Sequence, residues 1–211
     1  MDINEKERRA EIIATKFDGI FPPVEAFYIL SIAYSAKRCL DAFNRYDALG
    51  KKEENAEDLV SIVQEAVGHA AALSRYFWPS PHGKKKQPML KELKETRGEK
   101  LRKAFEVNEE SPLFNRDLRN AWEHFDERLD EYFLENDSGY FFPSCLLDTH
   151  ILADDPTGHI FKLLDIKEEC LVLMGKKYFY APIRTEVLRL HCQSKDFDAN
   201  GSRLRFHEKH L

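Results

Sequence analysis

The sequence predicts a mainly α-helical protein, with a helical bundle over residues 1–136 and a small appendage of short strands and a helix over residues 137–211. Apolar residues recur every three or four positions through most of the first part, as they do on amphipathic helices. The Pro22-Pro23 pair and the Pro- and Gly-rich stretch at residues 79–83 interrupt this pattern and separate the helices. After residue 139 short apolar runs typical of strands take over.

Composition bounds the class of protein. The chain has 211 residues, 43% of them hydrophobic, which is enough to build a real core. A formal net charge of −5 argues against a surface coated in positive charge for nucleic acid, although a local basic patch stays open. Four scattered cysteines without a CxxC pair are typical of reduced thiols. With a charged N-terminus and no bilayer-length apolar run, we expect a soluble, cytoplasmic protein without membrane contact.

Three long helices are expected in the first half, over residues 4–15, from just after Pro22-Pro23 to about residue 49, and over residues 56–78. The second of these has an apolar face wide enough to be well buried. That face consists of Phe27, Ile29, Leu30, Ala33, Tyr34, Cys39, Leu40 and Phe43.

A basic segment follows, polar from residue 84 to residue 98, with a short helix expected over residues 98–108. Lys84, Lys85 and Lys86 suggest a contact with a phosphate backbone or a flap over a cleft. The alternative is a solvated loop, since glutamates dilute the charge. Aromatic residues are absent between Lys84 and Arg102, which argues against base stacking there.

A long amphipathic helix is expected over residues 111–135, with Ser111 as its N-cap and Pro112 at its first position. Arg119, Asn120 and His124 lie in its middle. At about 100° per residue, Arg119 and His124 fall on opposite flanks of the apolar stripe, with Asn120 behind, so the core does not need them. The stripe consists of Leu113, Phe114, Leu118, Ala121, Trp122, Phe125, Leu129, Tyr132 and Phe133.

An arginine and a histidine so close together suit chemistry on a phosphodiester. A histidine can exchange a proton near neutral pH, and the planar guanidinium pairs with phosphate oxygens. Asn120, one turn before His124, is placed to orient the imidazole or to bind substrate. With a 2′-hydroxyl as the internal nucleophile, no metal would be needed. The alternative is an ordinary solvated face on which Arg119 pairs with Glu123.

Residues Arg119-Asn120-Ala121-Trp122-Glu123-His124 resemble the RxxxxH motif of the HEPN superfamily, whose motif lies on the last long helix of a four-to-five-helix bundle. The resemblance implies a HEPN-like bundle and a homodimer whose two motifs share a composite cleft. It implies a metal-independent endoribonuclease in which His124 acts as acid or base, Arg119 contacts phosphate and Asn120 supports them.

Such proteins are common in toxin–antitoxin and phage-defence systems, so RNA, an antitoxin or a nucleotidyltransferase are the partners that the resemblance implies. Some members instead are non-catalytic modules that bind a nucleotide, nucleic acid or a partner protein. A non-catalytic binding module is therefore the alternative to a nuclease.

In the appendage we expect strands over residues 159–164, 169–173 and 177–180, a helix opening at Pro182, and a polar, poorly ordered tail from residue 194. Asp148-Thr149-His150 with Asp154-Asp155 suggests either a catalytic dyad or a polar loop. Paired Glu-x-x-His motifs are absent from the sequence, so we expect neither a metal site nor another cofactor.

Overall fold

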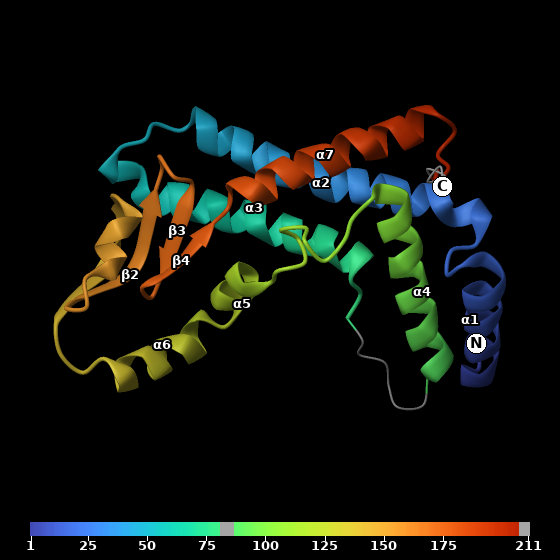
Figure 1. The fold of residues 1–211 in the computed structure, drawn as a ribbon, viewed down its shortest axis with the longest axis horizontal. Coiled ribbons are helices and arrows are strands. Elements are labelled where there is room, and N and C mark those ends of the chain that lie inside the picture. Colours follow the sequence, from blue (N-terminus) through green and yellow to red (C-terminus); the bar gives the residue numbers. More distant parts are fainter. Residues whose placement is uncertain (81–86, 207–211) are drawn as a thin grey trace. The chain divides into compact units, whose positions relative to one another are not determined.

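Seven α-helices and one four-stranded sheet make up the part of the chain that this computed structural model describes, residues 1–80 and 87–206 (Figure 1). The predicted class, mainly α-helical with a small C-terminal sheet, is confirmed. Among the helices of these ranges, none combines the length and the apolarity needed to cross a membrane.

Packing divides the chain into two compact units. Unit 1 comprises Met1–Lys37, Ala72–Phe114 and Leu188–Leu211, and unit 2 comprises Arg38–Ala71 and Asn115–Val187. Both units therefore contain chain from each side of residue 136, the boundary expected between bundle and appendage. Three helices contribute residues to both units: α2 (Glu25–Ala48), α3 (Ala56–Phe77) and α7 (Ala181–Ala199).

Unit 1 pairs α1 (Ile3–Phe17) with α4 (Pro88–Phe105), which lie side by side in Figure 1. Gly19 allows their close approach. Its φ is +80°, and a Cβ there would lie 2.2 Å from the backbone nitrogen of Arg97. Only glycine fits both the left-handed conformation and the space.

The interior of unit 1 contains a buried ion pair and a row of aromatic rings. Lys100 Nζ lies 3.1 Å from Glu25 Oε1, and the backbone nitrogen of Leu204 donates to the same carboxylate at 3.4 Å. The ring centroid of Phe105 lies 5.5 Å from that of Phe77 and 5.0 Å from that of Phe197, both with edge-to-face geometry. Residues near the C-terminus are thus part of this core.

Unit 2 holds the sheet together with α5 (Asp117–Glu123) and α6 (Phe125–Glu135). The sheet order is β1-β2-β3-β4, formed by β1 (Tyr140–Leu147), β2 (Gly158–Asp165), β3 (Cys170–Leu173) and β4 (Lys176–Phe179). β1 and β2 are parallel, joined by a crossover that contains the 3₁₀ helix η3 (His150–Asp154), and the other pairs are antiparallel.

Tyr180 ties the end of the sheet to the helices of unit 2. It is fully buried, its hydroxyl donates to the hydroxyl of Tyr46 at 2.9 Å, and its ring stacks on Phe43 at 5.9 Å. Arg184 reinforces this anchor through an ion pair with Asp47. The sheet therefore has a helical backing, as a sheet of this size requires.

The single helix expected over residues 111–135 is wrong. Residues 111–114 form turns, because the carbonyl of Leu113 accepts a hydrogen bond from the buried hydroxyl of Ser74 at 2.7 Å. The helix starts instead at Asp117, whose backbone nitrogen donates to Asn115 Oδ1 at 2.7 Å. It breaks at His124, where φ is −116° and ψ is 35°, and α6 follows.

Three further expectations need correction. α4 begins ten residues before the expected helix, with Pro88 in its first turn. Within the expected polar tail, residues 194–199 are helical, and Ser194 and Phe197 are buried. On α2 the expected buried face is split: Ile29, Ala33, Cys39 and Phe43 are buried, whereas Phe27, Leu30 and Tyr34 are exposed.

Candidate functional site

Arg119 lies on α5 and is engaged by a carboxylate of its own helix. Its Nε donates to Glu123 Oε1 at 2.9 Å and its Nη2 to Glu123 Oε2 at 2.7 Å. These hydrogen bonds raise the pKa of the guanidinium above its ordinary value. The ion pair considered from the sequence is confirmed, so the Nε and Nη2 side of the guanidinium, one of the two forks that can bind phosphate, is occupied by Glu123 in the single chain.

His124 occupies the break between α5 and α6, and 56% of its side chain is exposed. Its Nδ1 lies 3.1 Å from Glu127 Oε2. Within residues 1–80 and 87–206, Nε2 makes no hydrogen bond, and Glu127 rather than Asn120 holds the ring. Arg119 and His124 thus keep separate carboxylate partners, and in the described part of the chain no hydrogen bond or ion pair joins them.

The remaining residues predicted for nucleic-acid binding, Lys84, Lys85 and Lys86, lie outside the described residues. In the described ranges, groups of three or more His, Cys, Asp and Glu that could hold a metal ion are absent.

A polar cleft lies on the same unit as the motif and includes Trp122 from it. Its volume is about 460 Å³, and helix α3, helix α5 and strands β1 and β2 line it. Lys162 Nζ lies 5.7 Å from the Trp122 ring centroid and 5.1 Å from that of Phe125, which is cation–π geometry. Other lining residues are Glu57, Asp58, Ser61, Gln64, Pro143, Ser144 and Cys145.

A β-bulge shapes the wall of this cleft, which we call the Trp122–Lys162 cleft. The register of β1 with β2 shifts between Phe142 and Cys145, so Pro143 and Ser144 have no partner on β2. Bulges re-aim side chains and are common next to functional sites. Pro143 fits here because a bulge tolerates a residue without a backbone N–H.

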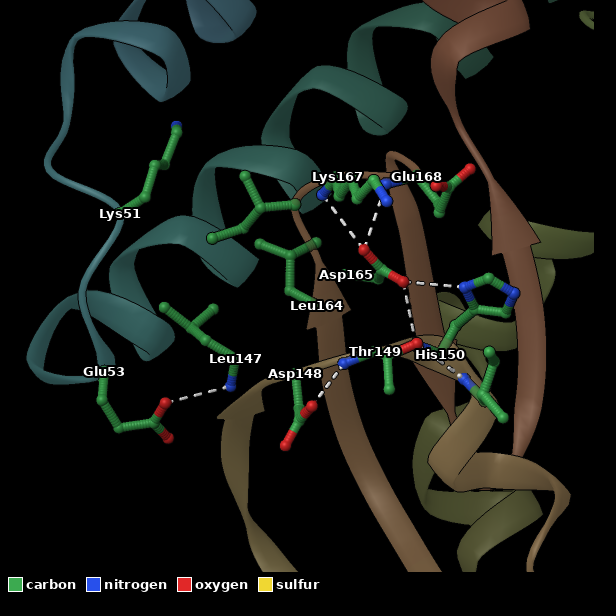
Figure 2. Close-up of a pocket in the computed structure, with 12 residues that line it drawn as sticks. Lys51, Glu53, Leu147, Asp148, Thr149, His150, Leu164, Asp165, Lys167 and Glu168 are labelled. Atoms are coloured by element: carbon green, nitrogen blue, oxygen red, sulfur yellow. Dashed lines mark hydrogen bonds and ion pairs between the residues drawn. The ribbon is translucent and has the colours of Figure 1, made fainter.

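A second and larger cleft, of about 570 Å³, lies where the parallel strands β1 and β2 end (Figure 2). Asp165, the last residue of β2, is buried beside it. Its Oδ2 accepts from the backbone nitrogen of His150 at 3.0 Å and lies 2.7 Å from His150 Nδ1. Its Oδ1 accepts from the backbone nitrogens of Lys167 and Glu168 at 3.0 and 3.1 Å.

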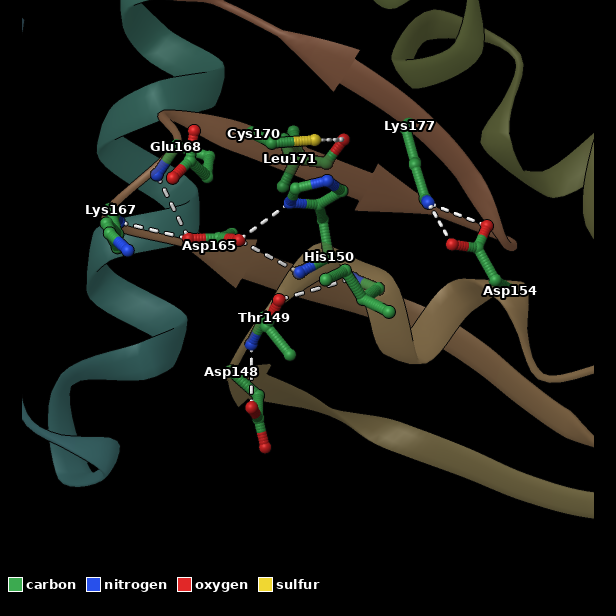
Figure 3. A network of polar contacts seen from close by, with 11 residues as sticks. Asp148, Thr149, His150, Asp154, Asp165, Lys167, Glu168, Cys170, Leu171 and Lys177 are labelled. Atoms are coloured by element: carbon green, nitrogen blue, oxygen red, sulfur yellow. Dashed lines mark hydrogen bonds and ion pairs between the residues drawn. The ribbon is translucent and has the colours of Figure 1, made fainter.

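These four hydrogen bonds make Asp165 a brace for the loops around it (Figure 3). Burial alone would raise the pKa of Asp165, but the hydrogen bonds from His150, Glu168 and Lys167 outweigh it, and the pKa lies below its ordinary value. In Figure 2 the His150 ring lies on the other side of Asp165 from Lys51 and Glu53. The pair therefore fastens the crossover to β2, and His150 is also one of the residues that line the cleft.

The sequence offered part of this arrangement. It suggests His150, but with Asp148 or Asp154-Asp155 as its partners. Asp154 instead pairs with Lys177, its Oδ1 2.7 Å from Nζ, and Asp148 caps the backbone nitrogen of Thr149 at 2.6 Å. The only signal for Asp165 was its position at the end of an apolar run, where a carboxylate at a parallel-strand edge is worth noting.

Comparison with known protein families, with curated proteins and with solved structures finds no match to any of them.

Proposed function

We propose that the protein is a metal-independent endoribonuclease of HEPN type that acts as a homodimer through Arg119, Asn120 and His124. One observation carries the proposal. His124 is exposed at a helix break, with one ring nitrogen held by Glu127 and the other without a hydrogen bond in the described part of the chain. A carboxylate-held imidazole with an accessible second nitrogen is suited to general acid–base catalysis.

The reaction uses the 2′-hydroxyl of RNA as the nucleophile. His124 Nε2 takes the proton of that hydroxyl as its oxygen attacks the adjacent phosphorus. The bond from phosphorus to the 5′-oxygen breaks, that oxygen takes a proton from water, and His124 gives the proton it accepted back to solvent. The products are a 2′,3′-cyclic phosphate and a 5′-hydroxyl. Arg119 stabilises the charge that develops on the non-bridging oxygens, after exchanging Glu123 for phosphate.

A second copy of the chain supplies what a single chain lacks. Arg119 and His124 have separate carboxylate partners within one chain. Two motif segments facing each other across a two-fold axis would bring His124 of one chain to the phosphate bound by Arg119 of the other. We therefore expect activity to depend on dimer formation.

The test is RNA cleavage in EDTA by purified protein. His124→Ala and Arg119→Ala should each lower the cleavage rate at least about a hundredfold, the scale of a lost acid–base or charge-stabilising group. His124 is exposed at the helix break and Arg119 pairs with Glu123 of its own helix, so the melting temperature should change little.

Two control variants remove a histidine and an arginine that are paired with glutamates outside the motif. His69 lies 3.7 Å from Glu65 on α3, and Arg8 pairs with Glu5 on α1. His69→Ala and Arg8→Ala should cleave like wild type. Undiminished cleavage by both motif variants would overturn the proposal.

The second candidate is a non-catalytic module that binds RNA or a partner. The pairing of Arg119 with Glu123 favours it, because this guanidinium is held by a carboxylate of its own chain. Glu123→Gln separates the two. If the chain is a nuclease, weakening this pair should raise the cleavage rate several-fold, because phosphate no longer competes with a carboxylate. If it is a binding module, RNA affinity should rise while RNA stays intact.

A further inference from the structure

The Trp122–Lys162 cleft combines a cation, aromatic rings and hydrogen-bonding groups within unit 2. Trp122 and Arg119 are three residues apart on α5, so they are neighbours on one side of that helix. The cleft is therefore adjacent to the motif. Lys162 is the cation in the cleft lining, where its ammonium lies near two ring faces.

Exposed aromatic rings lead along β1 to this cleft. Tyr140 is 74% exposed and Phe142 is 42% exposed. Two residues apart on a strand, they project to the same side at a spacing of about 7 Å. The next residues, Pro143 to Cys145, are the bulge that lines the cleft. β1 is also an edge strand, so no further strand covers its outer side within the described sheet.

We propose that the Trp122–Lys162 cleft is a nucleotide subsite for single-stranded RNA, and that Tyr140 and Phe142 stack the bases next to it. This inference rests on the proposed function, since it names the form of RNA that the motif receives. Lys162 neutralises a phosphate, and the rings hold bases without regard to sequence, as in other single-strand binding surfaces.

The carboxylates of Glu57 and Asp58 set a preference at this subsite. Both line the cleft at the first turn of α3, and both repel phosphate. The phosphate is therefore held at the Lys162 end, and the base faces the carboxylates. A carboxylate accepts a hydrogen bond from the amino group of cytosine, whereas uracil presents a carbonyl oxygen at that position. Cytosine is thus preferred over uracil.

The experiment measures binding without cleavage. The probes are fluorescein-labelled 2′-O-methyl oligonucleotides of about 12 nucleotides, one of cytosine and one of uracil, which have no 2′-hydroxyl to attack. Fluorescence anisotropy in EDTA gives Kd for the full chain. The variants are Lys162→Gln, Tyr140→Ala and the pair Glu57→Ala with Asp58→Ala.

The lysine and tyrosine variants each have a matched control. Lys176 lies 5.4 Å from the Tyr178 ring centroid on the same sheet but outside the cleft, and Tyr34 is an exposed ring on α2. Lys162→Gln should weaken binding about tenfold and lower the salt dependence by about one counterion, whereas Lys176→Gln should not. Tyr140→Ala should also weaken binding about tenfold, whereas Tyr34→Ala should not.

The carboxylate pair is tested by base preference. Wild type should bind the cytosine probe several-fold more tightly than the uracil probe, and Glu57→Ala with Asp58→Ala should remove that difference. Equal affinity of wild type for both probes would overturn the preference.

The two proposals fail in different ways. RNA cleavage that is lost in His124→Ala, together with Lys162→Gln and Tyr140→Ala binding like their controls, would overturn the subsite and leave the nuclease standing. Binding that depends on Lys162 and Tyr140, with RNA left intact by wild type, would overturn the nuclease and support the subsite. Tyr140 is largely exposed, so its variant tests the subsite even if Lys162→Gln does not fold.

Discussion

At Asp165, one buried carboxylate holds two loops and the end of a strand. It accepts four hydrogen bonds, from His150 twice and from the backbone of Lys167 and Glu168. Removing its charge should cost about 2–3 kcal/mol of unfolding free energy, because hydrogen bonds to a charged group are the stronger class. We expect this loss in Asp165→Asn, measured by urea unfolding at neutral pH.

The same residue predicts a pH dependence. Because the pKa of Asp165 is lowered in the folded chain, its stabilising contribution is present above the ordinary value of 3.8 and is lost as the pH falls through the folded pKa below it. The difference in unfolding free energy between wild type and Asp165→Asn should therefore shrink in acid. Asp154→Asn, in an exposed pair with Lys177, is the control, and a difference that does not change with pH would contradict the prediction.

The sequence indicates which residues have functional chemistry more often than it indicates which residues they contact in the fold. Arg119 and Glu123 are four apart on one helix, so their pairing follows from helical geometry. His150 and Asp165 are separated by η3 and the whole of β2, and only the parallel pairing of β1 with β2 brings them together. Partnerships across a sheet depend on topology, which local spacing does not encode.

At the scale of elements, Gly19 controls how α1 meets α4. Gly19→Ala adds a Cβ that meets the backbone of Arg97 and Thr96 and that strains a φ of +80°, so it should cost about 3 kcal/mol. Gly201 has a similar φ of +92°, but nothing lies within 4 Å of an added Cβ. Gly201→Ala should therefore cost only about 1 kcal/mol, and equal losses in thermal unfolding would show that the close approach is unimportant.

Elements with a strong period were predicted well, and elements set by tertiary contacts were not. α1, α2 and α3 follow their apolar spacing. The break between α5 and α6 at His124 has no Pro or Gly near it, although such a residue causes most helix kinks. β1 escaped prediction because Pro143 argues against a strand, and the bulge that accommodates it is a property of the pairing with β2. On α2 the apolar spacing alone does not tell the buried face from the exposed one, because apolar residues lie on both.

At the scale of the whole molecule, neither unit is a continuous stretch of chain. Unit 1 needs residues 188 onward, including Phe197, and unit 2 needs α2 and α3 residues together with Tyr180. A fragment of residues 1–136 should therefore lack cooperative thermal unfolding and be cut rapidly by protease, because it leaves both cores incomplete. A sharp melting transition for this fragment would support an independent N-terminal domain instead.

Buried Glu25 has a consequence for the order in which the chain is made. Its carboxylate pairs with Lys100 and accepts a hydrogen bond from the backbone of Leu204, so unit 1 is complete only after Leu204 has left the ribosome. His124 emerges well before β3, β4 and the start of α7, on which its unit depends. Translation would thus deliver His124 before the elements of its unit exist, so the motif would take its place only after residues 170–187 have been made.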